Sequence, residues 1–249
     1  MDRFLTYNIF TAVGNVHAFT TLRNTFTDND SIRYTGSQRG KIKNNRELLA
    51  SVMEVEPDCL VFPVQTHSSN VVSIEGIPAK VPGDTDALIT DEPGVCLCIQ
   101  TADCVPVLLY DPVQKIIAAI HAGWRGTVGL IVNKTIEKMI NQYGSSASNI
   151  LAAIGPSIGP EVYQVGEEVA KAVYECLPKP ESLIRNDSKG KYLFNLWEAN
   201  KQLLIECGIA GSNIEISGQC TFSLKEEYFS ARREGIDTGR MVSGIMLIK

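Results

Sequence analysis

Two histidines and one cysteine stand beside the ends of strand-like segments, where side chains are well placed to do chemistry. His67 lies in a polar stretch after a short apolar run, Cys104 precedes an apolar run, and His121 ends another. A free cysteine is most often core filler, but Cys104 has polar neighbours at the start of a strand, which favours a ligating or reactive thiol. Imidazole binds metal ions and exchanges protons near neutral pH. The three residues are therefore candidates for one site.

The set of two histidines and one cysteine suits a catalytic zinc ion. Structural zinc normally has four protein ligands, whereas three protein ligands leave a position for water or substrate. Copper also uses histidine and cysteine. The wide separations between 67, 104 and 121 along the chain are not those of a zinc finger. The residue types therefore predict a catalytic metal centre with zinc, and copper is the second candidate.

The same residues allow two other kinds of chemistry. In a thiol enzyme, Cys104 would be the nucleophile and His121 or His67 its base. In a copper oxidase, several copper ions would need many histidine ligands, and this chain has three histidines, the third being His17. The thiol enzyme thus stays open beside the metal centre, and the histidine count argues against the oxidase.

Two further features are candidates for binding an anion. The segment 155–160 contains two Gly-Pro steps, which favour either a loop with backbone N–H groups aimed at an anion or simply a rigid turn. Arg125 is placed to bind a phosphate with two N–H groups, or to make an ion pair at the surface.

Short apolar runs and amphipathic segments are interspersed along the chain. Continuous apolar runs are typical of strands buried on both faces, and they occur at 59–64, 87–90, 95–100, 105–110, 116–120, 150–154 and 241–248. Helical periodicity predicts helices at 44–55, 128–143, 166–176 and 196–207. Asn195 is the expected N-cap of the last helix, and Gly208 its C-cap. This order predicts an α/β fold with mixed β-sheets covered by helices, in a single domain over residues 1–249.

The composition narrows the class of protein. Hydrophobic residues make up 44% of the 249, and the net charge is −5, so neither nucleic acid nor an anionic membrane is an expected partner. No stretch approaches the roughly 18 apolar residues of a membrane span, and the N-terminus does not resemble a signal peptide. Seven cysteines, an odd number, favour reduced thiols in the cytoplasm.

Several motifs together resemble the YfiH-type laccase-domain family, also called the polyphenol oxidase family. The resemblance runs from about Phe19 to the end of the chain. The segments that carry it are Gln65-Thr66-His67, Thr101-Ala102-Asp103-Cys104-Val105-Pro106, His121-Ala122-Gly123-Trp124-Arg125-Gly126, Ile154-Gly155-Pro156-Ser157-Ile158-Gly159-Pro160 and Thr238-Gly239-Arg240-Met241.

The resemblance implies a fold, a metal and a set of activities. The fold would be a layered α/β sandwich of the cysteine-hydrolase-like type, and zinc would be held by His67, Cys104 and His121, which would also be the catalytic residues. The activities would be those of a purine nucleoside phosphorylase on adenosine, inosine and methylthioadenosine, and of an adenosine deaminase. Two alternatives come with the family: a cysteine-dependent hydrolase that edits peptidoglycan precursors, and a copper-dependent polyphenol oxidase, or laccase.

The resemblance also suggests which residues bind substrate. The family's Asn-Arg pair in the first helix matches Asn45-Arg46, and Arg46, Arg125 and Ser157 are the expected substrate-binding residues. Their partners would be a small-molecule nucleoside and phosphate, bound by a monomer or a small homo-oligomer. One segment departs from the family. Where the family has Phe-Ser-Thr-Arg-x-Gly-Gly, residues 19–25 read Phe-Thr-Thr-Leu-Arg-Asn-Thr, without the glycines and with the arginine displaced by one position.

Overall fold

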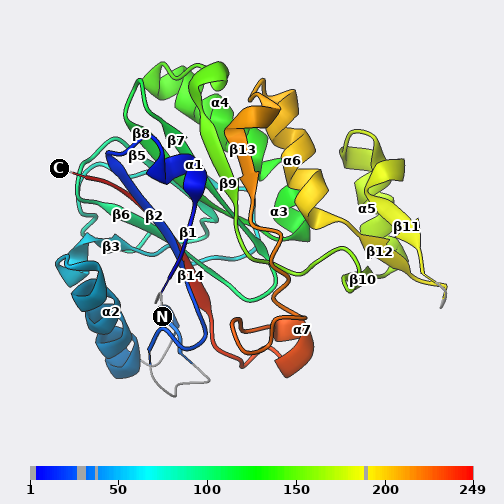
Figure 1. Ribbon diagram of the computed structural model, residues 1–249, viewed down its shortest axis with the longest axis horizontal. Coiled ribbons are helices and arrows are strands. Elements are labelled where there is room, and N and C mark those ends of the chain that lie inside the picture. The colour runs from blue at the N-terminus through cyan, green and yellow to red at the C-terminus, as the bar shows by residue number, and fades with distance from the viewer. Residues whose placement is uncertain (1–3, 27–31, 37–38, 188–189, 249) are drawn as a thin grey trace.

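Two β-sheets packed face to face form the centre of the molecule, and helices cover their outer faces (Figure 1). The computed structural model describes residues 4–26, 32–36, 39–187 and 190–248. The result is a layered α/β sandwich, so the predicted arrangement of mixed sheets covered by helices is confirmed.

The first sheet has five strands in an order far from that of the sequence. They are, from edge to edge, β1 (Phe4–Thr6), β2 (Val16–Thr21), β14 (Met241–Leu247), β6 (Cys96–Thr101) and β3 (Leu60–Val61). Neighbouring strands are antiparallel except for β3 and β6, which are parallel. The last strand of the chain thus lies in the middle of this sheet.

The second sheet has six strands and is also mixed. They are β13 (Ile214–Ile216), β9 (Leu151–Ile154), β7 (Val105–Asp111), β8 (Ile116–Ala122), β5 (Ala87–Thr90) and β4 (Val71–Ser73). The two outer pairs, β13 with β9 and β4 with β5, are parallel, and the inner pairs are antiparallel.

Strand β7 shows why its sequence is apolar without a break. Successive side chains of a strand point to opposite faces of the sheet. Leu108 and Tyr110 pack between the two sheets, whereas Val107 and Leu109 pack toward the helices on the outer face. Both faces are therefore buried, as the continuous apolar runs predicted.

In the described part of the chain, the helices are interspersed with the strands along the sequence. They are α1 (Asn8–Thr11), α2 (Arg39–Met53), α3 (Trp124–Val128), α4 (Ile131–Tyr143), α5 (Glu167–Cys176), α6 (Leu196–Glu206) and α7 (Ala231–Glu234), with short 3₁₀ turns at Pro57–Cys59, Ala147–Asn149, Pro180–Ser182 and Gly211–Asn213. Asn195 caps α6 as predicted, because its side chain accepts the Glu198 N–H at 3.0 Å. None of the helices in the described ranges has the length and apolarity that crossing a membrane requires.

The helix predicted at 128–143 is present as α4, and a separate short helix, α3, precedes it and overlaps the predicted range only at Val128. The chain breaks at Leu130, which lies in the left-handed region with φ of +59°. The loop that carries His67 runs close by: a Cβ at Gly126 would lie 3.3 Å from the Ser68 carbonyl oxygen, and one at Gly129 would lie 3.2 Å from the Ser69 Cβ. Gly126 and Gly129 thus leave room for the loop of His67, a tertiary contact that the local helical pattern does not contain.

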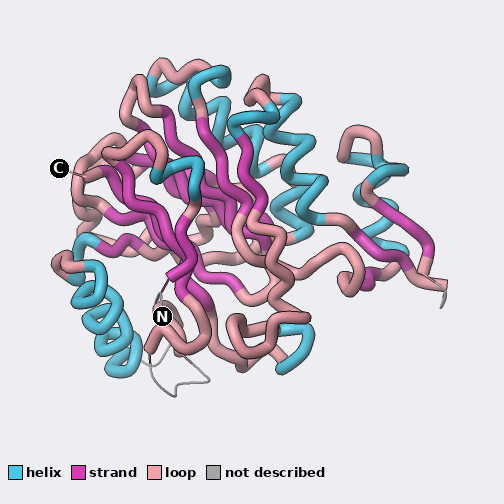
Figure 2. The backbone as a smooth tube through the Cα atoms, viewed as in Figure 1, coloured by secondary structure: helices cyan, strands magenta, loops and turns pink. Residues whose placement is uncertain are grey.

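A small lobe projects from the two-sheet body (Figure 2). It contains α5 and a three-stranded antiparallel sheet of β10 (Gln164–Val165), β12 (Tyr192–Phe194) and β11 (Ile184–Asn186). This sheet was not predicted, because 178–191 is polar and contains two prolines, a pattern that indicates an exposed loop.

Truncating the core between the sheets should lower stability strongly. Leu108 is fully buried there, so Leu108→Ala should reduce the free energy of unfolding by about 2–5 kcal/mol through lost burial and a residual cavity. Val113→Ala, at a position 63% exposed in the turn after β7, is the matched control and should change it by about 0.5 kcal/mol or less. Chemical denaturation of the two variants measures the difference, and equal midpoints would contradict it.

Candidate metal centre and active site

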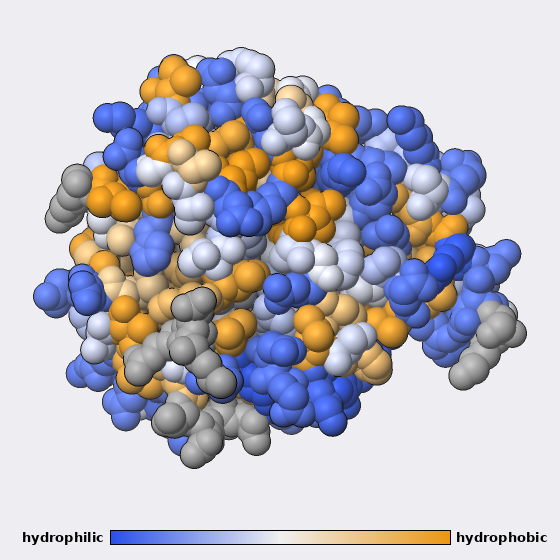
Figure 3. Space-filling view, in the orientation of Figure 1, coloured by the Kyte–Doolittle hydropathy of each residue, from blue (hydrophilic) through white to orange (hydrophobic). Residues whose placement is uncertain are grey.

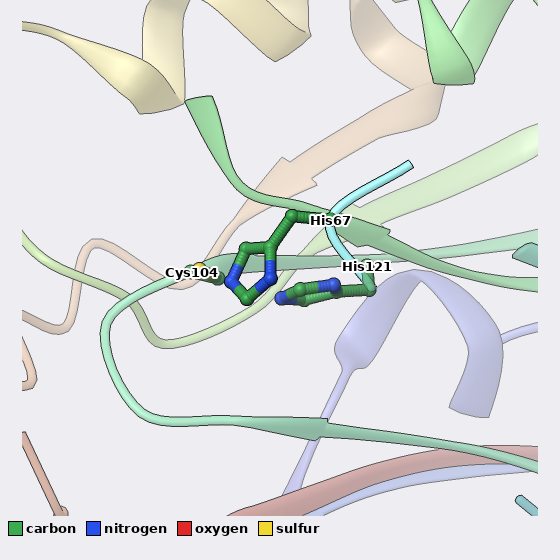
Figure 4. A group of neighbouring side chains, drawn as sticks. All are labelled: His67, Cys104 and His121. Carbon is green, nitrogen blue, oxygen red and sulfur yellow. The ribbon is translucent and has the colours of Figure 1, made fainter. Parts of the chain in front are cut away.

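Strand register brings the three candidate ligands to one end of the second sheet. Val105 of β7 pairs with Ala122 of β8, which places Cys104 next to the end of the strand that carries His121. His67 reaches the same point from the loop between β3 and β4. The ligand atoms of the three side chains all lie within 4.8 Å of one another, and Figure 4 shows both imidazole rings and the sulfur gathered together.

Asp86 holds the ring of His121. It directly precedes β5, whose Ala87 pairs with Ile120, so its side chain lies beside His121. The Nδ1 of His121 is 2.7 Å from Asp86 Oδ1, and both side chains are buried. Burial alone would raise the pKa of the Asp86 carboxyl, but hydrogen bonds from His121 and Ser68 hold it well below its usual range. An ionised carboxylate only accepts, so Nδ1 donates and Nε2 is left for a metal ion.

The same carboxylate also holds the loop of His67. Its oxygens accept the backbone N–H groups of Thr66, His67 and Ser68, at 3.2, 3.1 and 2.7 Å. His67 itself lies in the left-handed region with φ of +61°, which a residue with a Cβ rarely adopts. Asp86 therefore stabilises an unfavourable backbone conformation and fixes two of the three candidate ligands at once.

Gly123 leaves room for the cluster. A Cβ at this position would lie 3.0 Å from the Cys104 sulfur and 3.2 Å from Cδ2 of His67. Any side chain here would press on two of the three candidate ligands. The glycine thus preserves the space in which the sulfur and the two rings meet.

The side chains of the cluster shift one another's pKa values, so that the Cys104 thiolate and the protonated His121 ring are both favoured. Burial raises the pKa of the Cys104 thiol, but the charge and hydrogen bonding of His121, followed by those of His67, outweigh it and lower the pKa to about 6. Burial lowers the pKa of His121, but Cys104 and Asp86 raise it to about 9. A thiolate is the form that binds metal or attacks an electrophile. Without a cation, therefore, the sulfur is poised as a thiolate at neutral pH.

The donor set fits a three-ligand zinc ion. Imidazole nitrogen and thiolate sulfur are the ligands that zinc prefers, and the Nδ1 of His121 already has the carboxylate partner typical of zinc-bound histidine. His121 is buried, Cys104 is half-buried and His67 is exposed, so one side of the cluster stays open to small molecules. Among the described residues, this is the group of histidine, cysteine and acidic side chains that could hold a metal ion.

The cluster forms part of the wall of a cavity of about 830 Å³. A cavity of this size is large enough for a nucleoside-sized ligand. The wall combines apolar, amide, hydroxyl and guanidinium groups. Its residues are Arg33, Thr35, Gly36, Val64, Gln65, His67, Gln100, Thr101, Ala102, Asp103, Cys104, His121, Ile158, Tyr163, Ala231, Arg232, Ile236 and Arg240.

Asp103 ties the Cys104 turn to the segment around α7. One carboxylate oxygen accepts the Thr221 hydroxyl at 2.7 Å, and the other accepts the Ser230 hydroxyl and the Arg232 backbone N–H, at 3.0 and 2.6 Å. Arg232 is held over the ring of Tyr163, with 5.3 Å from its guanidinium carbon to the ring centre. Figure 3 shows the hydrophilic side chains that gather over α7. Asp103 therefore positions part of the cavity wall, and each of its oxygens already accepts hydrogen bonds from the protein.

The structure places the three predicted substrate-binding residues outside this cavity wall. Arg46 donates to the Tyr34 carbonyl oxygen, lies over the Phe62 ring and lines a neighbouring cavity of about 670 Å³. The Arg125 guanidinium lies over the Trp124 ring, at 4.3 Å. Ser157 is fully buried, and its hydroxyl accepts the Trp197 indole N–H at 2.6 Å. Their roles in substrate binding stay predictions.

The loop at 155–160 behaves as a rigid turn. The N–H of Gly155 donates to the Pro106 carbonyl oxygen, that of Ile158 to the Asp103 carbonyl oxygen, and that of Gly159 to the Cys220 sulfur. The N–H of Ser157 donates to the carbonyl oxygen of Gln219. With two prolines at the remaining positions, the loop presents no unused backbone N–H to an anion.

The segment that departs from the family pattern is built into the fold. Phe19 is fully buried in β2, and Arg23 pairs with Glu234 at 2.5 Å while lying over the Phe229 ring. Neither residue lines the cavity. The displaced arginine thus fastens α7 to the end of β2.

Sequence reasoning missed Asp86 and the arginines of the cavity wall. Asp86 ends the polar stretch Gly83-Asp84-Thr85-Asp86, immediately before an apolar run. That is the same strand-edge position that singled out Cys104, so the rule could have found it. Arg240 stands in the Thr238-Gly239-Arg240-Met241 segment noted above, but that segment gave no indication that the arginine faces the cavity, and Arg33 and Arg232 had no local signal.

Comparisons with known proteins identify the family and agree with this fold. The family described as "Multi-copper polyphenol oxidoreductase laccase" matches residues 20–248. A purine nucleoside phosphorylase of Bacteroides thetaiotaomicron is 40% identical, over 99% of this chain and 97% of that protein. Adenosine deaminase RL5, from an unknown prokaryotic organism, is 36% identical, over 94% of this chain and 95% of that protein.

A solved structure shares the whole fold. The crystal structure of YlmD from Geobacillus stearothermophilus superposes with a TM-score of 0.91 at 29% identity, covering 100% of this chain and 97% of that one. The resemblance noted in the motifs is therefore confirmed. By sequence and by fold, the chain belongs to the multi-copper polyphenol oxidoreductase laccase family, whose YfiH-type members include proteins named purine nucleoside phosphorylase and adenosine deaminase.

Proposed function

We propose that this protein is a zinc-dependent purine nucleoside phosphorylase that acts on adenosine, inosine and methylthioadenosine and also deaminates adenosine. The observation that carries the proposal is the convergence of His67, Cys104 and His121 on the wall of an open cavity. Relatives named for these two activities match almost the entire chain, which supports the same assignment.

The residues would divide the work as follows. His67, Cys104 and His121 would hold the ion, and Asp86 would keep the Nε2 of His121 directed at it. A zinc ion with three protein ligands supplies Lewis-acid chemistry and lowers the pKa of water from 15.7 to about 7. Burial, and then the charge of Cys104, raise the pKa of Tyr163, so its hydroxyl keeps its proton in the cavity wall.

Phosphorolysis requires that the protein bind phosphate and the nucleoside next to each other. A phosphate oxygen forms a bond to C1′ of the ribose, the bond from C1′ to the purine nitrogen breaks, and its electron pair leaves with the base, which takes up a proton. Such a reaction depends on orientation of phosphate and nucleoside in one cavity. The mixed apolar and cationic wall suits that pairing.

The test is turnover with and without phosphate and metal. We expect the metal-loaded protein to convert inosine to hypoxanthine only when phosphate is present, and to deaminate adenosine in its absence. Chelation should abolish both reactions, and added zinc should restore them, because the three ligands have no substitute among the described residues that line the cavity. Chromatographic assay of the purine products measures both. Turnover that is unchanged after complete metal removal would contradict the proposal.

A thiol hydrolase acting on an amide of a cell-wall precursor is the second candidate. The observation in its favour is the pKa of Cys104, lowered to about 6 beside His121. Its activity would survive chelation and disappear on alkylation of Cys104. A copper-dependent polyphenol oxidase ranks below both, because three histidines are too few for several copper ions, and it would require more than one copper per chain.

A further inference from the structure

Two arginines of the cavity wall converge on the same backbone carbonyl groups. Nη2 of Arg33 donates to the carbonyl oxygens of Ile236 and Thr238, at 2.5 and 3.3 Å. Arg240 donates to the same two oxygens, at 2.8 Å through Nη2 and 2.6 Å through Nη1, and also to its neighbour Gly239. The two guanidinium groups are therefore held close together by shared acceptors.

Backbone pairing fixes both arginines beside the metal ligands. Arg240 directly precedes β14, whose Met241 pairs with Thr101 at the end of β6, just before the turn that carries Cys104. The Arg240 N–H donates to the carbonyl oxygen of Ile32, which places Arg33 alongside. Both positions thus depend on the sheet, and both side chains line the cavity that contains His67, Cys104 and His121.

This pair of positive charges is only partly balanced by anionic groups. The ion pair recorded for Arg33 is with Asp237, at 3.9 Å, and that carboxylate is fully exposed to water, while Arg240 makes no ion pair within the described ranges. Burial, and then the charge of Arg33, lower the pKa of Arg240, which is the direction expected for crowded like charges. Two like charges this close repel each other, and water at a protein surface weakens this repulsion without removing it.

The rest of the cavity wall balances the pair only in part: burial and Arg33 lower the pKa of Arg240 by more than the charges of Cys104 and Asp103 raise it. Among the described residues that line it, the acidic side chain is Asp103, and its oxygens are taken by Thr221, Ser230 and the Arg232 N–H. The wall also carries the guanidinium of Arg232. A protein with a net charge of −5 thus concentrates cations in one cavity. Each guanidinium has five N–H donors, and the carbonyl groups use only some of them.

We propose that Arg33 and Arg240 form an oxyanion subsite that binds inorganic phosphate beside the metal centre. A phosphate bridging the two groups would accept the unused N–H donors and offset the repulsion between them. This inference rests on the proposed function, since it names the residues that hold the second substrate of phosphorolysis. It assigns phosphate to the pair at 33 and 240 rather than to Arg125.

Kinetics in phosphate test the assignment. The variants are Arg33→Gln and Arg240→Gln, with Arg185→Gln, an exposed arginine of the small lobe, as the control. We expect the KM for phosphate in inosine phosphorolysis to rise roughly 10-fold or more in each of the first two, since each loses hydrogen bonds to a charged ligand. The KM for inosine should change far less, and the control should match the wild type in both constants.

A binding measurement keeps the test independent of turnover. Inorganic phosphate should raise the melting temperature of the wild-type protein and of the Arg185→Gln variant, and this shift should shrink in Arg33→Gln and Arg240→Gln. If the wild-type protein shows no phosphate-dependent turnover, the proposed function is wrong. The phosphate-induced shift in melting temperature would still test the subsite.

Three results would overturn the assignment. The first is a phosphate KM and a phosphate-induced shift that are unchanged in both variants. The second is an effect confined to Arg125→Gln. The third is a loss restricted to a nucleoside 5′-phosphate as substrate, which would mean that the pair binds a phosphate carried by the nucleoside.

Discussion

Replacing His121 with alanine should remove both the bound metal and the activity on nucleosides. Loss of a residue that merely orients a ligand typically costs 10–100-fold in metal affinity or activity, so loss of a ligand itself should cost more than about 100-fold. His121 is also the residue that joins Asp86 to Cys104, so its removal leaves a buried carboxylate without its imidazole partner. Metal analysis of the purified variant and its rate on inosine measure the two losses.

His17→Ala is the matched control for this experiment. His17 is another histidine on a strand, in β2, and it does not line the cavity. Its replacement should leave metal content and rate close to the wild-type values. Full activity in His121→Ala, or equal losses in the two variants, would refute the metal centre.

Replacing Asp86 with asparagine should weaken metal binding by roughly 10–100-fold. The amide fills the same space but presents N–H donors where the carboxylate accepts His121 Nδ1–H and the N–H groups of Thr66, His67 and Ser68. The ring of His121 and the left-handed conformation of His67 would both lose their support. Titration of the metal-free variant with zinc, followed by a competing chelator, measures the affinity.

Asp84→Asn controls for the loss of a carboxylate in the same turn. Asp84 is exposed, and it accepts hydrogen bonds from the side chains of Thr66 and Asn70 without touching either histidine ring. It should bind zinc nearly as tightly as the wild type. Equal weakening in the two variants would mean that Asp86 acts only through general stability of the loop.

The central strands of the second sheet were predictable because each is a short, continuous apolar run bounded by turn residues. Residues 87–90 form β5 with the predicted bounds, and the run predicted at 105–110 forms β7 with one more residue. Unbroken apolarity over a few residues, between turn residues, is typical of a strand buried on both faces. The separate helix α3 was not predicted, and the loop that packs against it and against the break before α4 lies far away in the sequence.

The candidate site was predictable in its ligands and not in its support. His67, Cys104 and His121 were identifiable because histidines are scarce in this chain and because each residue stands at the end of an apolar run. Asp86 looks like an ordinary turn residue until the register of β5 against β8 places it beside His121. Arg33 and Arg240 come together only through a contact between residues about 200 positions apart, which no local pattern contains.

The turn at 102–104 is the link by which the chain leaves the first sheet, after β6, and enters the second, at β7. Cys104 therefore lies at the crossing from the first sheet to the second, whereas His121 lies within a strand of the second sheet. A metal ion bound by both residues would link the two sheets directly. Metal binding and the stability of the packing between the two sheets would then be coupled. Removal of the metal would therefore lower the free energy of unfolding as well as the activity.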